Sequence, residues 1–168
     1  MRRLFRGGRV VDLGAGHGLL AHVMLLLDDS SPSALVLDKT LPPSSAKLHE
    51  VLAQSWPRLS GRVTFRAGEL EDVDIFHADV VVSSHACGDL TDRILQRAAA
   101  AKARVAVLPC CHDLGVGDAG GLTGWMHGAV AIDVMRATRL TQHGYRIWTQ
   151  TIPADITPKN RLLLGAPS

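Results

Sequence analysis

A short apolar strand followed by three alternating glycines, almost at the N-terminus, constrains the fold of this chain more than any other feature. Residues 10–18 read VVDLGAGHG, and an apolar run from Leu19 to Leu27 follows. The β-branched residues favour a strand, the run favours a helix, and glycines permit a tight turn with close backbone approach to a ligand. We therefore predict a strand–loop–helix unit that directs the helix N-terminus at a nucleotide cofactor.

Two departures from the dinucleotide fingerprint G-x-G-x-x-G narrow the choice of cofactor. The third glycine is Gly18, whereas the fingerprint requires glycine at the position of Leu19, and Asp12 lies two residues before Gly14. A carboxylate beside the loop would repel a diphosphate, but it suits the ammonium group of a zwitterionic cofactor that carries a sulfonium. S-adenosylmethionine is such a cofactor. The same departures disfavour the alternative of an NAD-dependent oxidoreductase.

This glycine loop resembles the first motif of class I S-adenosylmethionine-dependent methyltransferases. In that family an acid at the end of the second strand binds both ribose hydroxyls. Here residues 34–38 read ALVLD and end at Asp38, 20 residues beyond Gly18, a spacing typical of a ribose acid. Glu69 matches a family position near the adenine, although it would also favour the first turn of a helix through the helix dipole. The resemblance implies a set of cofactor-binding residues, namely Asp12, Gly14, Gly16, Gly18, Asp38 and Glu69.

Composition indicates a single domain over residues 1–168. The chain is 46% hydrophobic, enough for a sizeable core, and its net charge of +2 leaves the substrate open. The longest nearly apolar run, from Leu19 to Leu27, is far shorter than the ~18 residues that span a bilayer, so we expect no membrane partner. An odd count of three cysteines does not suit a disulfide framework. We therefore expect reduced thiols and a cytoplasmic protein.

Apolar strand-like runs alternate with helical stretches, which predicts an open, mostly parallel sheet covered on both faces. The family resemblance implies a Rossmann-like α/β fold with seven strands, the last one antiparallel. The expected strands are Arg9–Leu13, Ala34–Asp38, Arg62–Ala67, Ala78–Ser84, Ala103–Pro109, Tyr145–Thr151 and Arg161–Leu164. The expected helices are Gly18–Leu27, Ser44–Ser55, Leu90–Lys102 and Leu122–His143.

Two histidines and all three cysteines follow the fourth and fifth expected strands. Residues 85–92 read HACGDLTD and residues 110–112 read CCH. One interpretation is that the cysteines are small buried packing residues. Another is zinc binding, but the spacing is not that of a zinc finger and adjacent cysteines bind one ion awkwardly, so we assign no metal. The third is catalytic, because a histidine can take a proton from a hydroxyl acceptor. All three stay open.

These two segments resemble the His-x-Cys-Gly and Cys-Cys-His pair of a methyltransferase branch that includes the CHHC-zinc-finger tRNA 2′-O-methyltransferase. The resemblance implies that the acceptor is handled near His85, Cys87, Cys110 and His112, with His85 or His112 as a base for a hydroxyl. An RNA ribose hydroxyl is the first expected acceptor, and a small molecule is the other. An alternative is a non-catalytic cofactor-binding module completed by a protein partner, and a homo-oligomer stays open as well.

Overall fold

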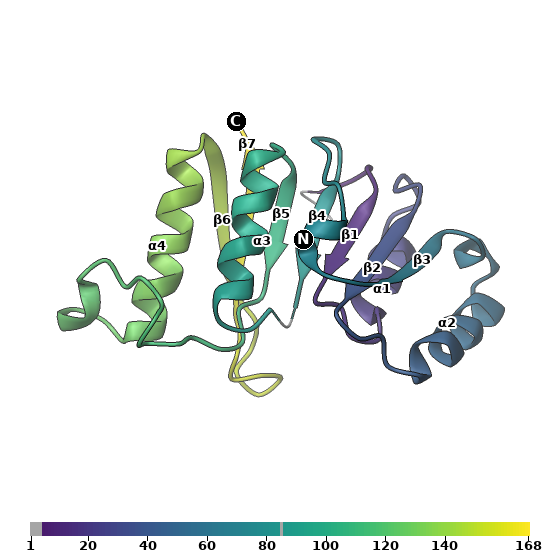
Figure 1. Cartoon of the computed structure of the whole chain (residues 1–168), viewed down its shortest axis with the longest axis horizontal. Helices are drawn as coiled ribbons and strands as arrows, with labels where there is room; N and C mark the ends of the chain where they lie inside the picture. The colour runs from purple at the N-terminus through teal and green to yellow at the C-terminus, as the bar shows by residue number, and fades with distance from the viewer. Residues whose placement is uncertain (1–4, 85) are drawn as a thin grey trace.

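A mostly parallel, seven-stranded sheet forms the centre of the computed structural model, which describes residues 5–84 and 86–168 (Figure 1). The strand order is β3-β2-β1-β4-β5-β7-β6. The strands are β1 (Val10–Leu13), β2 (Ala34–Asp38), β3 (Val63–Ala67), β4 (Val80–Ser83), β5 (Arg104–Val107), β6 (Tyr145–Thr151) and β7 (Arg161–Pro167). Only β7 runs antiparallel to its neighbours, β5 and β6. The predicted fold class and the antiparallel last strand are confirmed.

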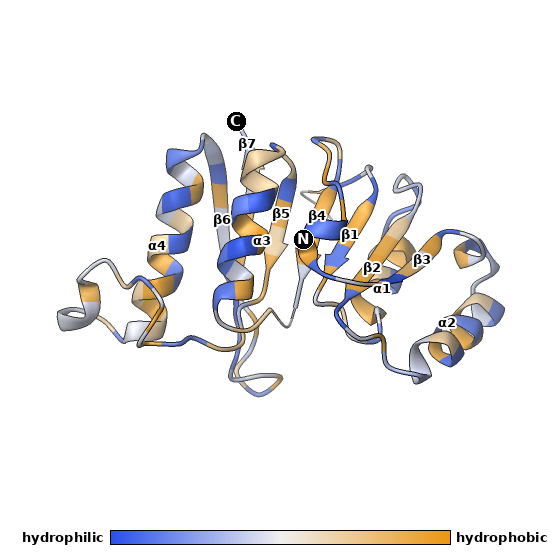
Figure 2. Ribbon diagram, in the orientation of Figure 1, coloured by the Kyte–Doolittle hydropathy of each residue, from blue (hydrophilic) through white to orange (hydrophobic). Residues whose placement is uncertain are grey.

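Helices pack on the two faces of the sheet. They are α1 (Leu19–Leu27), α2 (Ser44–Ser55), α3 (Asp89–Ala100) and α4 (Gly128–Gln142), with short 3-10 helices at Pro57–Leu59, Leu70–Asp72 and Leu122–Gly124. One core lies between the sheet and α3 and α4, and a second contains the buried side of α1. In Figure 2, β4 is largely hydrophobic while α2 and α3 alternate in hydropathy. This difference is typical of a strand buried on both faces and of helices with one face in water.

The main difference from the predicted elements is the start of the last helix. The expected helix over Leu122–His143 is divided, because residues 122–124 form a 3-10 helix and α4 begins only at Gly128. His127 ends the intervening turn, with extended backbone at ψ 135° and Nδ1 accepting a hydrogen bond from the Ala129 amide (3.3 Å). A histidine side chain thus caps a helix where residue periodicity alone suggested continuation.

The sheet topology brings the predicted site segments to one edge. β1 pairs with β2 on one side and with β4 on the other, so the strand order reverses there, and β4 pairs with β5 in parallel. The segments that follow these parallel strands therefore gather at their carboxyl ends, where α/β sheets bind ligands. In the described part of the chain, none of the helices has the length and apolar character needed to cross a membrane.

Candidate functional site

The glycine loop after β1 needs its glycines for conformation and for space. Gly14, Gly16 and Gly18 have φ angles of +65°, +53° and +75°, in the left-handed region that favours glycine. A Cβ on Gly18 would lie only 2.8 Å from a methyl carbon of Val36, whereas a Cβ on Gly16 would meet nothing within 4 Å. Gly18 therefore lets α1 pack against β2, and Gly16 leaves open space beside the loop.

Asp38, at the end of β2, is joined to that loop. Its Oδ2 accepts a 2.7 Å hydrogen bond from the Gly16 amide. Gly14, Asp38 and Glu69 line one cavity of about 250 Å³, together with Lys39, Leu90 and Arg93. The structure therefore brings together three of the predicted cofactor residues, from the segments after β1, β2 and β3.

Glu69 holds the start of a short helix, as one of its two predicted functions requires, and its contact with the adenine stays a prediction. Its carboxylate faces the cavity and pairs with Lys39, with Oε1 3.0 Å from Nζ. Its backbone amide donates to Asp72 Oδ2 (2.8 Å), which fixes the start of the 3-10 helix over residues 70–72. The side chain is about half exposed (53%), so the carboxylate is accessible to a ligand while the backbone holds the turn.

Asp12 lies behind the loop rather than in the cavity. The residue is fully buried, and its Oδ2 accepts a 3.1 Å hydrogen bond from the Ala21 amide in the first turn of α1. Its Oδ1 has no partner among the described residues. The pKa of Asp12 is raised to about 7, mainly by burial and to a smaller extent by the nearby Asp38 charge, against the hydrogen bond from Ala21. Its observed contact is with α1, and direct contact with a cofactor ammonium stays a prediction.

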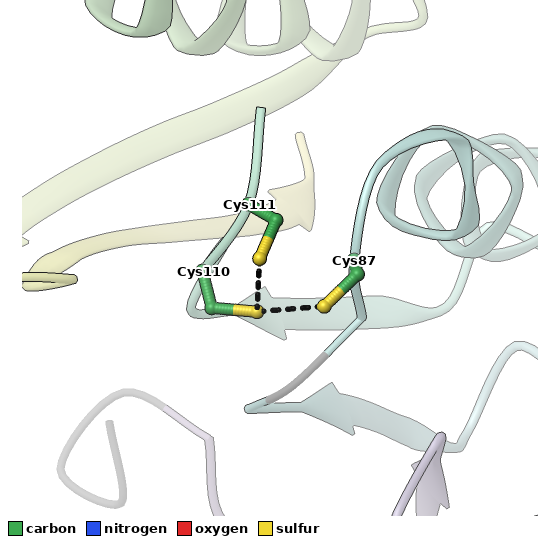
Figure 3. A group of neighbouring side chains, drawn as sticks. All are labelled: Cys87, Cys110 and Cys111. Carbon is green, nitrogen blue, oxygen red and sulfur yellow. Dashed lines mark hydrogen bonds between the residues drawn. The ribbon is translucent and has the colours of Figure 1, made fainter. Parts of the chain in front are cut away.

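The three cysteines converge, as expected for loops that follow neighbouring strands (Figure 3). The Sγ atoms of Cys87 and Cys110 are 3.1 Å apart, and those of Cys110 and Cys111 are 3.7 Å apart. The Gly88 amide donates to the Cys111 carbonyl (3.3 Å), so backbone also joins the two loops. Because Cys87 and Cys111 are exposed, the interpretation of these two as buried packing residues is wrong.

His112 is the predicted base whose surroundings the structure describes; His85 lies outside the described residues. The side chain of His112 is only 5% exposed, and its Nε2 is 2.8 Å from Asp133 Oδ1. A carboxylate on one ring nitrogen holds the imidazole in one orientation. This arrangement is compatible with a base that acts through Nδ1, and the catalytic role of His112 stays a prediction.

Asp133 belongs to a network of charged residues that the sequence did not reveal. Arg136, almost fully buried on α4, donates to Asp133 Oδ1 (3.1 Å), to both carboxylate oxygens of Asp92 on α3 and to the Gly88 carbonyl (3.0 Å). Arg161 Nε donates to Asp133 Oδ2 (2.8 Å). These contacts position His112 and the turn at Gly88. Except for Asp133 and Arg136, the partners are separated by 21 to 48 residues along the chain, so local sequence patterns do not reveal the network.

A sequence profile described as a methyltransferase domain matches residues 5–114. The chain belongs to this methyltransferase domain family. No curated protein matches the sequence. Among solved structures, an O-methyltransferase family protein from Burkholderia thailandensis has a TM-score of 0.62 at 18% identity, covering 97% of this chain and 52% of its own. The ribosomal protein L11 methylase of Lactobacillus delbrueckii subsp. bulgaricus has a TM-score of 0.63 at 13% identity, with 99% and 73% covered.

A third similar structure, the B. subtilis m1A22 tRNA methyltransferase TrmK, has a TM-score of 0.58 at 19% identity, covering 95% of this chain and 60% of its own. The chain spans about half the length of several O-methyltransferases it matches. At these identities the likeness establishes the fold alone, and the names of two of these proteins indicate different acceptors, a ribosomal protein and a tRNA. The family and the fold together indicate S-adenosylmethionine as the cofactor.

The residues at the sheet edge fit this cofactor. The Asp38 carboxylate has acceptor capacity beyond its bond from Gly16, which suits the two ribose hydroxyls. In the same cavity, Gly14 allows a ligand to approach the backbone closely and Leu90 supplies an apolar side chain. A second cavity borders the loop at Ala15 and Gly16. An adenosine group would thus be held between the loop and the segments after β2 and β3.

Proposed function

We propose that this chain is an S-adenosylmethionine-dependent methyltransferase that transfers the methyl group directly to an acceptor held beside the ends of β4 and β5. The observation that carries the proposal is that the glycine loop is hydrogen-bonded to Asp38, the carboxylate predicted to bind the ribose. Three glycines with positive φ shape the loop, Gly14 and Asp38 line one cavity, and the Gly16 amide donates to the Asp38 carboxylate. This arrangement suits a nucleoside better than a diphosphate, which the Asp38 carboxylate would repel.

When bound, the cofactor supplies a methyl group on a sulfonium, and the sulfur leaves with the electron pair of the broken carbon–sulfur bond. The chain's task is alignment, because a nucleophile placed in line with that bond reacts as though intramolecular. Asp38 and the glycine loop would fix the adenosine, while the segments at Cys87 and Cys110 would hold the acceptor. His112, oriented by Asp133, would take the proton of a hydroxyl acceptor through Nδ1.

An RNA ribose hydroxyl is the acceptor we favour over a neutral small molecule. Lys159, in the segment between β6 and β7, lies close enough to Cys111 for its charge to act on that thiol. Arg161 contributes a second cation at the start of β7, 37% exposed and paired with Asp133. Cations beside an acceptor site suit the phosphates that flank a ribose. A small-molecule hydroxyl would have no need of them.

Cofactor binding is tested by calorimetric titration of the full chain with S-adenosylmethionine, S-adenosylhomocysteine and NAD. We expect the two adenosyl ligands to bind and NAD not to bind. Asp38→Ala should weaken binding about 10- to 100-fold, the value of charge-assisted hydrogen bonds to two hydroxyls. Asp74→Ala is the matched control, since it removes an exposed aspartate just before β4. NAD binding, or equal affinity in both variants, would contradict the proposal.

Methyl transfer is tested with S-adenosylmethionine labelled on the methyl group, supplied with tRNA, with DNA of matched sequence and with small hydroxyl compounds. Label in RNA but not in DNA supports a ribose hydroxyl. Label only in small molecules would overturn the RNA acceptor and leave the enzyme class intact. His112→Gln should slow transfer to a hydroxyl about 100-fold or more and leave cofactor affinity within about twofold.

The second candidate is a cofactor-binding module that acts only with a partner chain. The observation that favours it is a run of exposed apolar side chains after β5, where Leu114, Val116 and Trp125 are 62%, 78% and 85% exposed. Such side chains beside a site are typical of a surface that another molecule covers. Tight cofactor binding without transfer to any acceptor would favour this candidate over the enzyme.

A further inference from the structure

We propose that Cys87, Cys110 and Cys111 hold a zinc ion through their three sulfur atoms, next to the cofactor cavity. The three Sγ atoms all lie within 4.8 Å of one another (Figure 3). Two of the thiols are exposed and none is in a disulfide. The proposal rests on this geometry and not on the identity of the methyl acceptor.

The distances between the sulfur atoms fit a single tetrahedral ion. A zinc–sulfur bond of about 2.3 Å at tetrahedral angles places two ligand sulfurs about 3.8 Å apart. The Cys110–Cys111 pair is at 3.7 Å and the Cys87–Cys110 pair at 3.1 Å. The Cys110–Cys111 pair is thus already at the tetrahedral distance, and a movement of about 0.7 Å at Cys87 would bring the Cys87–Cys110 pair to it. Adjacent cysteines bind one ion awkwardly in general, yet in Figure 3 the Cys110 sulfur points toward Cys87 and the Cys111 sulfur points toward that of Cys110.

The backbone holds these thiols together before any ion binds. The Gly88 amide donates to the Cys111 carbonyl (3.3 Å), and Arg136 donates to the Gly88 carbonyl (3.0 Å). Gly88 has a φ of +59°, a conformation that directs the chain from Cys87 into α3 and that a side chain would strain. The site is therefore preorganised by two loops and a buried arginine, as metal sites of high affinity require.

Electrostatics favour a cation at this place. The three Sγ atoms lie within 4.8 Å of one another. Three thiolates at such distances would repel one another. A divalent cation removes that repulsion, and thiolates are the ligands that select zinc over magnesium or calcium.

The location connects the ion to the proposed reaction. The Leu90 amide donates to the Cys87 carbonyl (3.2 Å), and Leu90 lines the cofactor cavity. Three protein ligands leave one of the four positions of a tetrahedral zinc ion for a further ligand, as in catalytic zinc sites. A zinc ion here would also fix the distance between the segments after β4 and β5, where the acceptor is expected.

The first experiment measures zinc in the full chain, purified with a non-thiol reductant and without chelators. We expect one zinc per chain by elemental analysis. Substitution with Co²⁺ should give the intense near-ultraviolet charge-transfer band of thiolate ligands and the visible bands of a tetrahedral ion. Cys87→Ser, Cys110→Ser and Cys111→Ser should each weaken zinc binding about 100-fold or more. His77→Ala, which removes an exposed histidine before β4, is the matched control and should bind zinc as the original chain does.

Alkylation of the folded chain decides the matter even if the serine variants fail to fold. Zinc should protect all three thiols from N-ethylmaleimide, with protection lost on addition of a chelator, as mass spectrometry would show. Less than a tenth of a zinc per chain, or a Co²⁺ complex without the thiolate band, would overturn the proposal. A Cys87–Cys110 disulfide in protein purified without reductant, combined with no zinc uptake after reduction, would assign the cluster to redox chemistry instead.

Discussion

Asp12 should make the stability of this protein fall as the pH rises from 5 to 8. The pKa of this carboxyl rises from its ordinary value of 3.8 to about 7 in the folded chain, mainly because it is buried. Between these two values the unfolded chain is ionised at Asp12 while the folded chain keeps the proton. Unfolding then releases a proton, so a higher pH favours the unfolded state. Above about pH 7 both states are ionised and the effect is complete.

The magnitude follows from that difference. Each pH unit in the window lowers the free energy of unfolding by about 1.4 kcal/mol, so the whole window is worth about 4 kcal/mol and the part above pH 5 about 3 kcal/mol. His22 acts in the opposite sense. Burial lowers the pKa of His22, against the hydrogen bond to the Gly18 carbonyl. Below its ordinary pKa of 6.5 the unfolded chain therefore binds a proton more readily than the folded chain, so the contribution of His22 to stability increases as the pH rises to 6.5. A comparison with Asp12→Asn separates the two, because His22 is present in both proteins.

The assay is urea unfolding of the original chain and of Asp12→Asn at pH 5, 6, 7 and 8. The amide oxygen can keep the bond from the Ala21 amide, but the new NH2 group replaces an atom without a partner among the described residues. We expect Asp12→Asn to be the less stable protein at pH 5, by about 1–3 kcal/mol. This deficit should shrink by about 3 kcal/mol on going to pH 8. A difference between the two proteins that is constant with pH would refute the reasoning.

Three further predictions concern the loop and the charged network. Gly18→Ala should lower the free energy of unfolding by about 2–5 kcal/mol, because the new Cβ would collide with Val36 and because φ +75° strains any side chain. Gly144→Ala, at φ +79° but in open space, should cost only about 1–2 kcal/mol. Thermal melts in which the two variants lose equal stability would contradict this prediction. Asp38→Ala should abolish the rise in melting temperature that S-adenosylhomocysteine gives, and an undiminished rise would exclude Asp38 as the ribose acid. Arg136→Ala should cost about 3–5 kcal/mol in urea unfolding because it removes the hydrogen bonds of a buried guanidinium to Asp92, Asp133 and the Gly88 carbonyl, and a cost below about 1 kcal/mol would show that the network is not structural.

The elements that could be predicted from sequence are those with a strong local signal. The β1 segment carries β-branched residues followed by glycines, and the predicted strand over Arg9–Leu13 differs from the structure by one residue. The bounds of β2 and α2 were predicted without error. The prediction of the start of α4 was wrong because the residue that caps this helix is a histidine. Histidine has no strong preference for helix starts, and residue periodicity does not reveal a cap.

The candidate site divides in the same way. The position of Asp38 beside the glycine loop was predictable because one helix and one strand fix its distance along the chain from that loop, while its ribose contact stays a prediction. The convergence of the cysteines was predictable from the expected adjacency of strands four and five, which the pairing of β4 with β5 confirms. The burial of Asp12 was not, since a carboxylate after apolar residues is equally compatible with a ligand contact and with a helix-start contact. That Asp12 Oδ1 has no partner among the described residues is a property of packing alone.

The charged network is the part that sequence reasoning missed, and it explains how an exposed site can be precisely held. Arg136 is almost fully buried, and each of its donors faces a group from α3, α4 or the Gly88 turn. An arginine in a helix pattern is usually on the solvated face, so no local rule assigns it to the interior. Its bidentate contact with Asp92 and its bond to Gly88 tie the turn after Cys87 to two helices, while Asp133 ties the loop at His112 to the same residue. Because the two acceptor-side loops share one buried cation, a change at Arg136 should alter both the thiol cluster and the histidine together, and neither loop can be repositioned alone.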